Sequence, residues 1–330
     1  MQLVATTPGL FPLPDDAKER LSDLKGHQKG DMIAGDEGEE IVTGYDEVRE
    51  ELVATQQDAG LDRVVEGQAR WDDMLAHPLV VHDAVETGGI VRYYDNNNFY
   101  RDPIVRGELT FDGDMAADLE AAAALTADLQ AVVPGPYSLA SLATDEHYGD
   151  DAEFLDAIAE FLAGEVDAFP EVETLFVLEP SLVTDPPGDG EDERASEAVD
   201  VVAGATDADV VVQSYWGALP EKVHAHLLDA DVDAIGYDFV SDHERNLENI
   251  AEYGTKDDVA LGVVDGQNTL VEDPDQIVDR VEWVDQQTPP AQDFETVYLT
   301  ANTELFYLPV NRFAEKLQAL GAAAERGVGE

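Results

Sequence analysis

Short β-branched runs alternate with longer amphipathic segments along the chain, and this alternation limits the possible folds more than any other feature. Eight runs are predicted to be strands: residues 3–5, 61–65, 129–133, 175–178, 210–212, 234–235, 259–264 and 297–299. Helical patterns lie between them, such as 151–166 and 311–324, each with its apolar residues on one face. Strands that alternate with helices in this way form parallel sheets.

Eight such units in a chain of 330 residues predict an α/β fold of the (β/α)8 TIM-barrel type. An open doubly wound sheet fits less well, and no G-x-G-x-x-G follows the first strand to indicate dinucleotide binding. The stretch of about 71–113 is too long for a simple crossover. Its apolar runs at 90–94 and 104–109 predict a small inserted β-hairpin after the second strand. No interdomain linker is evident, so residues 1–330 are expected to form a single domain.

The charge of the chain is extreme, with 73 acidic residues against 18 Lys and Arg and a formal net charge of -55. Nucleic acid and anionic membranes are therefore not expected as partners. With 44% hydrophobic residues the chain can still build a core. Repulsion between the carboxylates would be severe at low ionic strength, whereas at molar salt the Debye length falls to about 3 Å. These features favour a halophilic protein in a high-salt cytoplasm over a mildly acidic mesophilic enzyme.

Cysteine is absent, which excludes disulfides, thiolate catalysis and thiolate metal sites. No apolar run approaches the roughly 20 residues that span a bilayer, and the N-terminal sequence has no basic region followed by a long apolar stretch. A cytoplasmic location is the expectation from both observations.

Polar residues follow the predicted strands, where barrel enzymes place their chemistry. The candidates for substrate binding are Glu66, Gln68, Arg70, Glu179, Gln213, Tyr215, Asp238, Asp265, Asn268 and Thr303. Glu66 or Asp238 would suit a general base if burial raises its pKa. Each carboxylate has an alternative interpretation as a solvated acid on a halophilic surface, and no catalytic residue is assigned.

Six motifs at the strand ends follow one another in a recognisable order. They are TTPGLFP at 6–12, EGQ at 66–68, PGPYSL at 134–139, LEP at 178–180, LGVVDGQN at 261–268 and NTELFYLP at 302–309. In order and spacing they resemble cobalamin-independent methionine synthase, a zinc-dependent barrel enzyme that transfers a methyl group to the sulfur of homocysteine. Each Gly and Pro in these motifs could be explained by the needs of a turn. That explanation does not account for the match of successive strand ends to the motifs of one family.

The zinc ligands of that family are replaced in this chain. The resemblance implies ligand positions at Gln213 and Tyr215, where the family has His and Cys, at Asp238, where it has Glu, and at Thr303, where it has Cys. One carboxylate cannot hold zinc, so no cofactor is predicted in this chain. The family acids that bind the amino group of homocysteine also change, and the corresponding positions hold Gln68 and Leu178.

The sequence QSYWG at 213–217 and the motif at 261–268 resemble the N-terminal, zinc-lacking barrel of the long, two-barrel form of the enzyme. The resemblance implies a subunit or paralogue that assists methyl transfer from a donor such as a folate to homocysteine, together with a zinc-bearing homologous barrel. Two alternatives remain open. One is a zinc-independent enzyme of unknown substrate, and the other is a non-catalytic barrel that binds a ligand or scaffolds a complex.

Two further segments carry weaker signals. The aromatic and amide-rich stretch from Tyr93 to Pro103 suits either a loop that folds over the barrel mouth or a simple hairpin turn. His224 and His226 lie two apart on a probable helix and so do not share a face, which predicts surface residues rather than a metal site.

Overall fold

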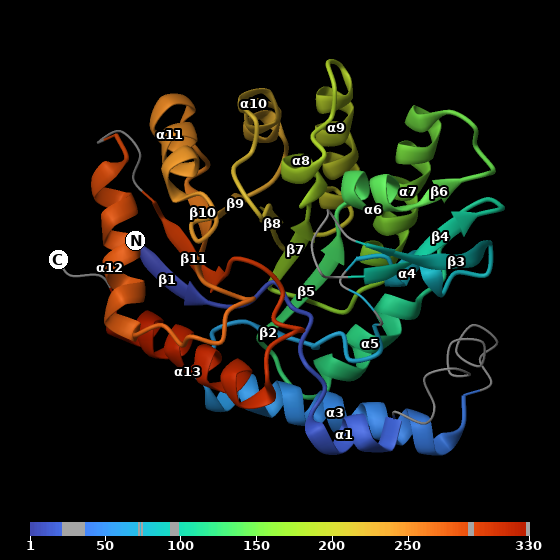
Figure 1. Cartoon of the computed structure of the whole chain (residues 1–330), viewed down its shortest axis with the longest axis horizontal. Coiled ribbons are helices and arrows are strands. Elements are labelled where there is room, and N and C mark those ends of the chain that lie inside the picture. Colours follow the sequence, from blue (N-terminus) through green and yellow to red (C-terminus); the bar gives the residue numbers. More distant parts are fainter. Residues whose placement is uncertain (22–36, 72, 74, 93–98, 290–293, 328–330) are drawn as a thin grey trace.

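A parallel eight-stranded sheet lies at the centre of the computed structural model, which describes residues 1–21, 37–71, 73, 75–92, 99–289 and 294–327 (Figure 1). The strands are hydrogen-bonded in the order β1-β11-β10-β9-β8-β7-β5-β2. Their bounds are β1 Gln2–Ala5, β2 Val64–Val65, β5 Leu129–Pro134, β7 Thr174–Leu178, β8 Asp209–Gln213, β9 Ala234–Asp238, β10 Asp258–Val264 and β11 Thr296–Ala301. Each corresponds to one predicted strand.

The sheet curls so that its first and last strands meet. β1 and β2 are joined through Ala5, whose carbonyl oxygen accepts from the backbone N–H groups of Asp62 at 3.0 Å and Arg63 at 3.2 Å. The other neighbours form regular parallel ladders, for example Val64 opposite Leu129. The predicted α/β barrel is therefore confirmed, with a closure between β1 and β2 that is weaker than the seven ladders.

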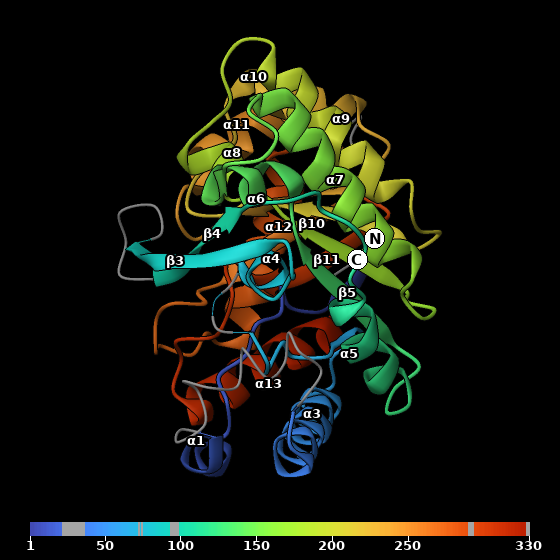
Figure 2. The ribbon, with the colours of Figure 1, turned by 90° about the vertical axis from the view of Figure 1, so that its right-hand side faces the viewer.

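Helices surround the sheet (Figures 1 and 2). The longer ones are α3 Glu39–Asp58, α5 Asp114–Ala123, α7 Asp151–Asp167, α9 Glu191–Ala203, α10 Glu221–Asp229, α11 His243–Tyr253, α12 Pro274–Gln287 and α13 Val310–Arg326, and the shorter ones are α1 Asp15–Leu21, α4 His77–Val80, α6 Pro136–Leu142 and α8 Ser181–Thr184. Among the described helices, none combines the length and the apolar character that a membrane crossing requires.

The inserted hairpin after β2 is also confirmed, and it projects from one side of the ring of helices (Figure 2). Its strands are β3 Val85–Arg92 and β4 Phe99–Val105, and the short β6 Thr144–Asp145 pairs with β4. The predicted bounds 90–94 and 104–109 were wrong by several residues. β4 ends at Val105, and beyond it Arg106 N donates to Ala84 O at 2.9 Å and Leu109 N donates to the Tyr148 hydroxyl at 2.9 Å.

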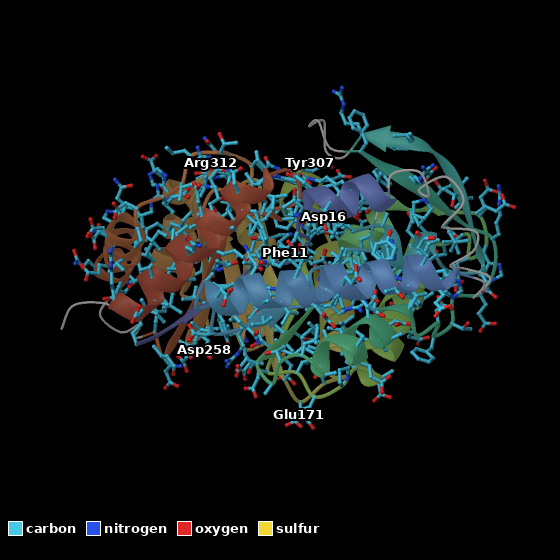
Figure 3. All side chains as sticks on the ribbon, turned by 90° about the horizontal axis from the view of Figure 1, so that it is seen from below. Phe11, Asp16, Glu171, Asp258, Tyr307 and Arg312 are labelled. Atoms are coloured by element: carbon cyan, nitrogen blue, oxygen red, sulfur yellow. The ribbon has the colours of Figure 1, made fainter. Side chains whose placement is uncertain are left out.

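Carboxylates cover the outer surface while apolar side chains fill the interior. Figure 3 shows this from below, with Asp16 and Glu171 at the outside and Phe11 within the fold. The Phe11 ring lies 4.6 Å from that of Phe313 on α13. Helix α7 begins at Asp150, whose carboxylate accepts from two N–H groups of the first turn. A complete apolar core thus coexists with a net charge of -55.

Candidate functional site

The strands of the sheet are parallel, so their carboxyl ends meet at one face of the barrel. We call the residues that end these strands, together with the loop residues up to five positions beyond them, the crown. All ten predicted site residues belong to it: Glu66, Gln68 and Arg70 after β2, Glu179 after β7, Gln213 and Tyr215 at β8, Asp238 at the end of β9, Asp265 and Asn268 after β10, and Thr303 after β11. Eight of them are buried or largely buried, whereas Asp265 is half-buried and Asn268 is exposed.

Asp238 is the most heavily bonded carboxylate of the crown. Its Oδ1 accepts from the N–H groups of Val240 at 2.9 Å and Ser241 at 2.8 Å, and its Oδ2 accepts from Trp216 N at 2.8 Å. Asn302 Nδ2 lies 3.1 Å from both oxygens. Burial raises the pKa of Asp238, and these hydrogen bonds partly oppose the rise. Asp238 therefore ties the loop after β8 to the end of β11.

The positions that correspond to the first two zinc ligands lie beside this carboxylate. Gln213 packs on β9 so closely that a Cβ on Gly236 would come within 2.3 Å of its Oε1. Its Nε2 donates to Ser214 O at 2.7 Å. Tyr215 is completely buried, with its ring 4.8 Å from that of Trp216. Gln213 and Tyr215 are therefore both fixed in the interior at the end of β8.

The side chains at the four positions do not fit a zinc ion. Zinc in proteins is held by imidazole, thiolate and carboxylate groups, whereas Gln213, Tyr215 and Thr303 offer an amide, a phenol and a hydroxyl. Thr303 Oγ1 already donates to Glu304 O at 3.2 Å. Both oxygens of Asp238 accept from N–H groups, and within the described ranges no three His, Cys, Asp or Glu residues are grouped so as to hold a metal.

Glu179 is completely buried and fully hydrogen-bonded. Its oxygens accept from Tyr137 N at 2.9 Å, from Ser138 N at 2.8 Å and from Ser138 Oγ at 2.6 Å. Burial raises the pKa of Glu179 to about 7, and these bonds limit the rise. The fit requires Gly135, because a Cβ there would lie 2.1 Å from the Glu179 carboxyl carbon. Glu179 therefore fixes the start of α6 against the end of β7.

The carboxylate of Glu66 contacts Gln68 and Arg49 within the protein. Its Oε2 accepts from Gln68 N at 2.5 Å, and its Oε1 lies 3.9 Å from Arg49 Nε on α3. Arg49 also binds Asp118 of α5 at 2.6 Å. Burial, reinforced by the charge of Asp118, raises the pKa of Glu66 to about 8. Gln68 Oε1 in turn accepts from Leu10 N at 2.7 Å and joins the loops after β1 and β2.

Arg70 is engaged within the protein. Its guanidinium forms an ion pair with Glu37 and lies 4.8 Å from the centre of the Tyr45 ring. Asp118 is 3.9 Å away. The negative charges around it raise the pKa of Arg70.

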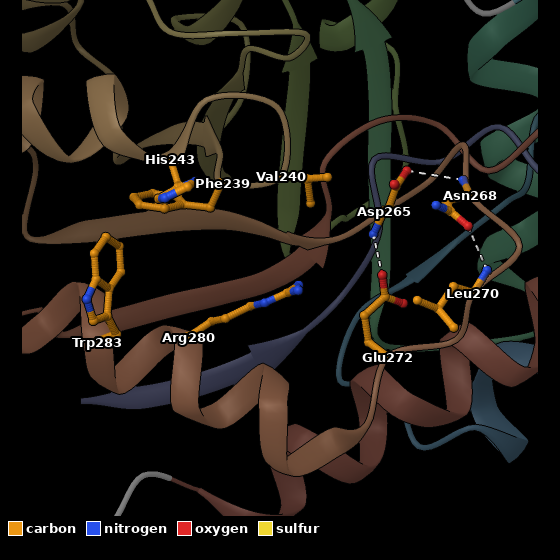
Figure 4. A pocket seen from close by; sticks show the side chains of 9 residues that line it. All are labelled: Phe239, Val240, His243, Asp265, Asn268, Leu270, Glu272, Arg280 and Trp283. Carbon is orange, nitrogen blue, oxygen red and sulfur yellow. Dashed lines mark hydrogen bonds between the residues drawn. The ribbon is translucent and has the colours of Figure 1, made fainter.

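Asp265 and Asn268 face a different, more open part of the molecule. They line a pocket of about 590 Å³ together with Phe239, His243, Arg280 and Trp283 (Figure 4). Asp265 Oδ1 accepts from Gln267 N at 2.9 Å and Asn268 N at 3.1 Å, so the carboxylate mainly shapes its own loop.

The sequence interpretation missed two buried groups and leaves one prediction untested. Glu304 is 1% exposed, and its only signal was its place in the motif at 302–309 that follows the last predicted strand. His224 was predicted to lie on the surface and is completely buried, with Nε2 2.8 Å from the Tyr237 hydroxyl, because it lies on the same helix face as Leu227. Of the Tyr93 to Pro103 loop, residues 93–98 lie outside the described residues.

Comparison with known proteins identifies related sequences and folds. A family model described as the N-terminal domain of cobalamin-independent synthase matches residues 82–289. A 5-methyltetrahydropteroyltriglutamate–homocysteine methyltransferase of Salinibacter ruber is 26% identical over 78% of this chain, which spans only 38% of that relative. A methionine synthase of Saccharolobus solfataricus is 23% identical, with 87% of this chain and 85% of the relative covered.

The structural comparison agrees. A B12-independent methionine synthase from Shewanella sp. W3-18-1, solved with selenomethionine, superimposes with a TM-score of 0.80 at 20% identity, covering 98% of this chain and 96% of that one. A putative vitamin-B12-independent methionine synthase from Listeria monocytogenes gives a TM-score of 0.71 at 16% identity with full coverage of both chains. At these identities the likeness bears on the fold.

Proposed function

Because the chain belongs to the cobalamin-independent methionine synthase family, through a match to its N-terminal domain, we propose that it serves methyl transfer to homocysteine without a zinc ion of its own. It acts as a subunit or paralogue that needs a zinc-bearing partner barrel of the same family. Its own small-molecule ligands are homocysteine or a methyl donor such as a folate.

One observation carries this proposal. The side chains at the positions that correspond to zinc ligands are mostly used within the fold. Gln213 and Thr303 donate to backbone carbonyl oxygens, and Gln213 Oε1 is a buried amide oxygen without a partner among the described residues. Asp238, the one carboxylate at these positions, binds the backbone of the neighbouring loop and Asn302. Soft ligands that activate a thiol are missing, so the activation of homocysteine is assigned to the partner.

The proposed setting is a cytoplasm with very high salt. A net charge of -55 favours a medium in which carboxylates are strongly screened. Nucleic acid and membranes are not proposed as partners, because both are polyanionic surfaces.

A reconstitution experiment tests the proposal. The purified chain, a zinc-bearing barrel of the family and their mixture are assayed in molar KCl for methyl transfer from 5-methyltetrahydropteroyltriglutamate to homocysteine. We expect no turnover by this chain alone and a higher rate for the mixture than for the zinc-bearing barrel. Turnover by this chain alone would favour a zinc-independent enzyme, and a mixture no faster than the zinc-bearing barrel would count against a subunit role.

A further inference from the structure

Glu304 is a buried carboxylate without a hydrogen bond. It lies three residues beyond the end of β11 and is 1% exposed. Neither Oε1 nor Oε2 has a hydrogen-bond partner among the residues that the structure describes. Burial raises the pKa of Glu304 to about 8, and its own backbone N–H and the side chain of Gln267 offset part of this rise. Neither contact meets the geometry of a hydrogen bond.

The other crown carboxylates are all engaged. Glu179 accepts three hydrogen bonds from α6, and Asp238 accepts from three backbone N–H groups and from an amide. Glu66 accepts from Gln68 N and faces a guanidinium, and Asp265 accepts from two N–H groups of its own loop. Glu304 is thus the crown carboxylate, among those described, whose two oxygens are both buried without a hydrogen-bond partner.

Neighbouring loops fix the backbone around Glu304. A Cβ on Gly266 would come within 2.6 Å of Glu304 O, so the loop after β10 packs directly on this backbone. On the other side, Leu305 N donates to Leu10 O at 3.2 Å. Burial, together with the carboxylates of Glu304 and Asp73, raises the pKa of Tyr307 to about 12. The Tyr307 side chain is 47% exposed.

A buried polar group without a partner costs about 1–3 kcal/mol, and more if it is charged, so native proteins rarely retain one without a role. We propose that Glu304 is the anchor for the ammonium group of a small-molecule ligand bound at the crown, and that this ligand is an amino acid. The amino-acid identity rests on the proposed function, whereas the preference for an ammonium group rests on Glu304 alone. In the family that the sequence resembles, acids bind the amino group of homocysteine at the positions that hold Gln68 and Leu178 here. Glu304 would supply a carboxylate in their place.

Binding has a defined proton balance. The free protein holds Glu304 as a neutral carboxylic acid, and the ligand arrives as an ammonium ion. The pair that forms is a carboxylate and an ammonium, so one proton leaves the carboxyl group for the solvent. No covalent bond forms or breaks in the ligand.

The test uses isothermal titration calorimetry on the full chain in molar KCl at pH 7. The probes are L-methionine, n-butylammonium chloride, which keeps only the ammonium, and 3-(methylthio)propanoate, which lacks it. Each titration is run in two buffers with different enthalpies of ionisation, so that the number of protons released is measured. Glu304→Gln keeps the shape of the side chain and removes the charge. Glu325→Gln, at the opposite end of the barrel on α13, is the matched control.

We expect the wild type to bind L-methionine with proton release and to bind 3-(methylthio)propanoate much more weakly. Glu304→Gln should weaken L-methionine binding by about 10- to 100-fold and abolish the proton release, whereas Glu325→Gln should change neither. Binding of n-butylammonium that Glu304→Gln abolishes would support the ammonium anchor even if L-methionine did not bind and the proposed substrate failed. The inference is overturned if no ammonium probe binds the wild type, or if Glu304→Gln binds L-methionine as the wild type does.

Discussion

Asn302 Nδ2 lies 3.1 Å from each carboxylate oxygen of Asp238, so an amide after β11 satisfies a carboxylate at the end of β9. Asn302 Oδ1 also accepts from Gly266 N at 2.9 Å. One side chain therefore connects β9, β10 and β11 at the crown. The Asn302 amide adds to the three backbone N–H groups that already donate to the Asp238 oxygens.

Replacement of Asn302 by Ala should destabilise the protein by about 1–3 kcal/mol, because Asp238 and Gly266 N each lose a buried partner. Denaturant unfolding in molar KCl measures the free energy of unfolding. Asn311→Ala, on the exposed face of α13, serves as the control and should stay within about 0.5 kcal/mol of the wild type. Equal stability of both variants would show that the Asn302 connection contributes nothing.

Glu304→Gln should change how stability depends on pH. Burial raises the pKa of Glu304 from 4.5 to about 8, so the folded state holds this proton more tightly than the unfolded chain does. The wild type should therefore lose about 1.4 kcal/mol per pH unit, relative to the variant, as the pH rises from about 5 to about 8. Above that range the difference should level off. If the free energy of unfolding changed with pH in the same way in the wild type and in Glu304→Gln, the burial of an unpaired acid would be contradicted.

Gly135→Ala should destabilise the protein by about 1–3 kcal/mol, because the new methyl group would displace the carboxyl of Glu179 and weaken its three hydrogen bonds. Thermal unfolding measures the effect. Gly89→Ala, in the exposed part of β3 with open space around the added Cβ, is the matched control and should be almost neutral. If Gly135→Ala unfolded at the same temperature as the wild type, the Glu179 side chain would not be held in place by its hydrogen bonds.

Stability should rise steeply with salt. At 0.1 M KCl the Debye length is about 10 Å and the carboxylates repel one another, whereas at 1 M it is about 3 Å. We expect Tm to rise by about 10 °C or more between 0.1 and 2 M KCl. A Tm that does not depend on KCl would remove the basis for a high-salt setting.

The sequence predicted the eight sheet strands because each is a short apolar run between longer amphipathic segments, and burial on both faces of a parallel sheet requires such runs. It predicted the hairpin bounds poorly. Residues such as Glu86 and Thr87 are exposed on a projecting ribbon, so no apolar pattern marks them. The identity of the crown residues was also predictable, since strand ends fix their place.

What the sequence could not predict is which way each crown side chain points. Glu66 faces Arg49 on α3, a helix whose position depends on the tertiary fold. Glu179 directly follows β7 and Glu304 lies three residues beyond β11, yet Glu179 accepts three hydrogen bonds and Glu304 accepts none from the described residues. The difference arises from neighbouring loops far away in the chain, which local patterns do not encode.

Metal analysis tests the zinc-free crown most directly. The full chain is purified in molar KCl, equilibrated with an excess of zinc, passed through a desalting column in the same salt and measured by elemental analysis. The occupied Asp238 oxygens and the unsuitable groups at Gln213, Tyr215 and Thr303 predict far less than one zinc ion per chain. About one tightly held zinc ion per chain, lost on Asp238→Asn substitution, would contradict the proposed division between a zinc-free barrel and a zinc-bearing partner.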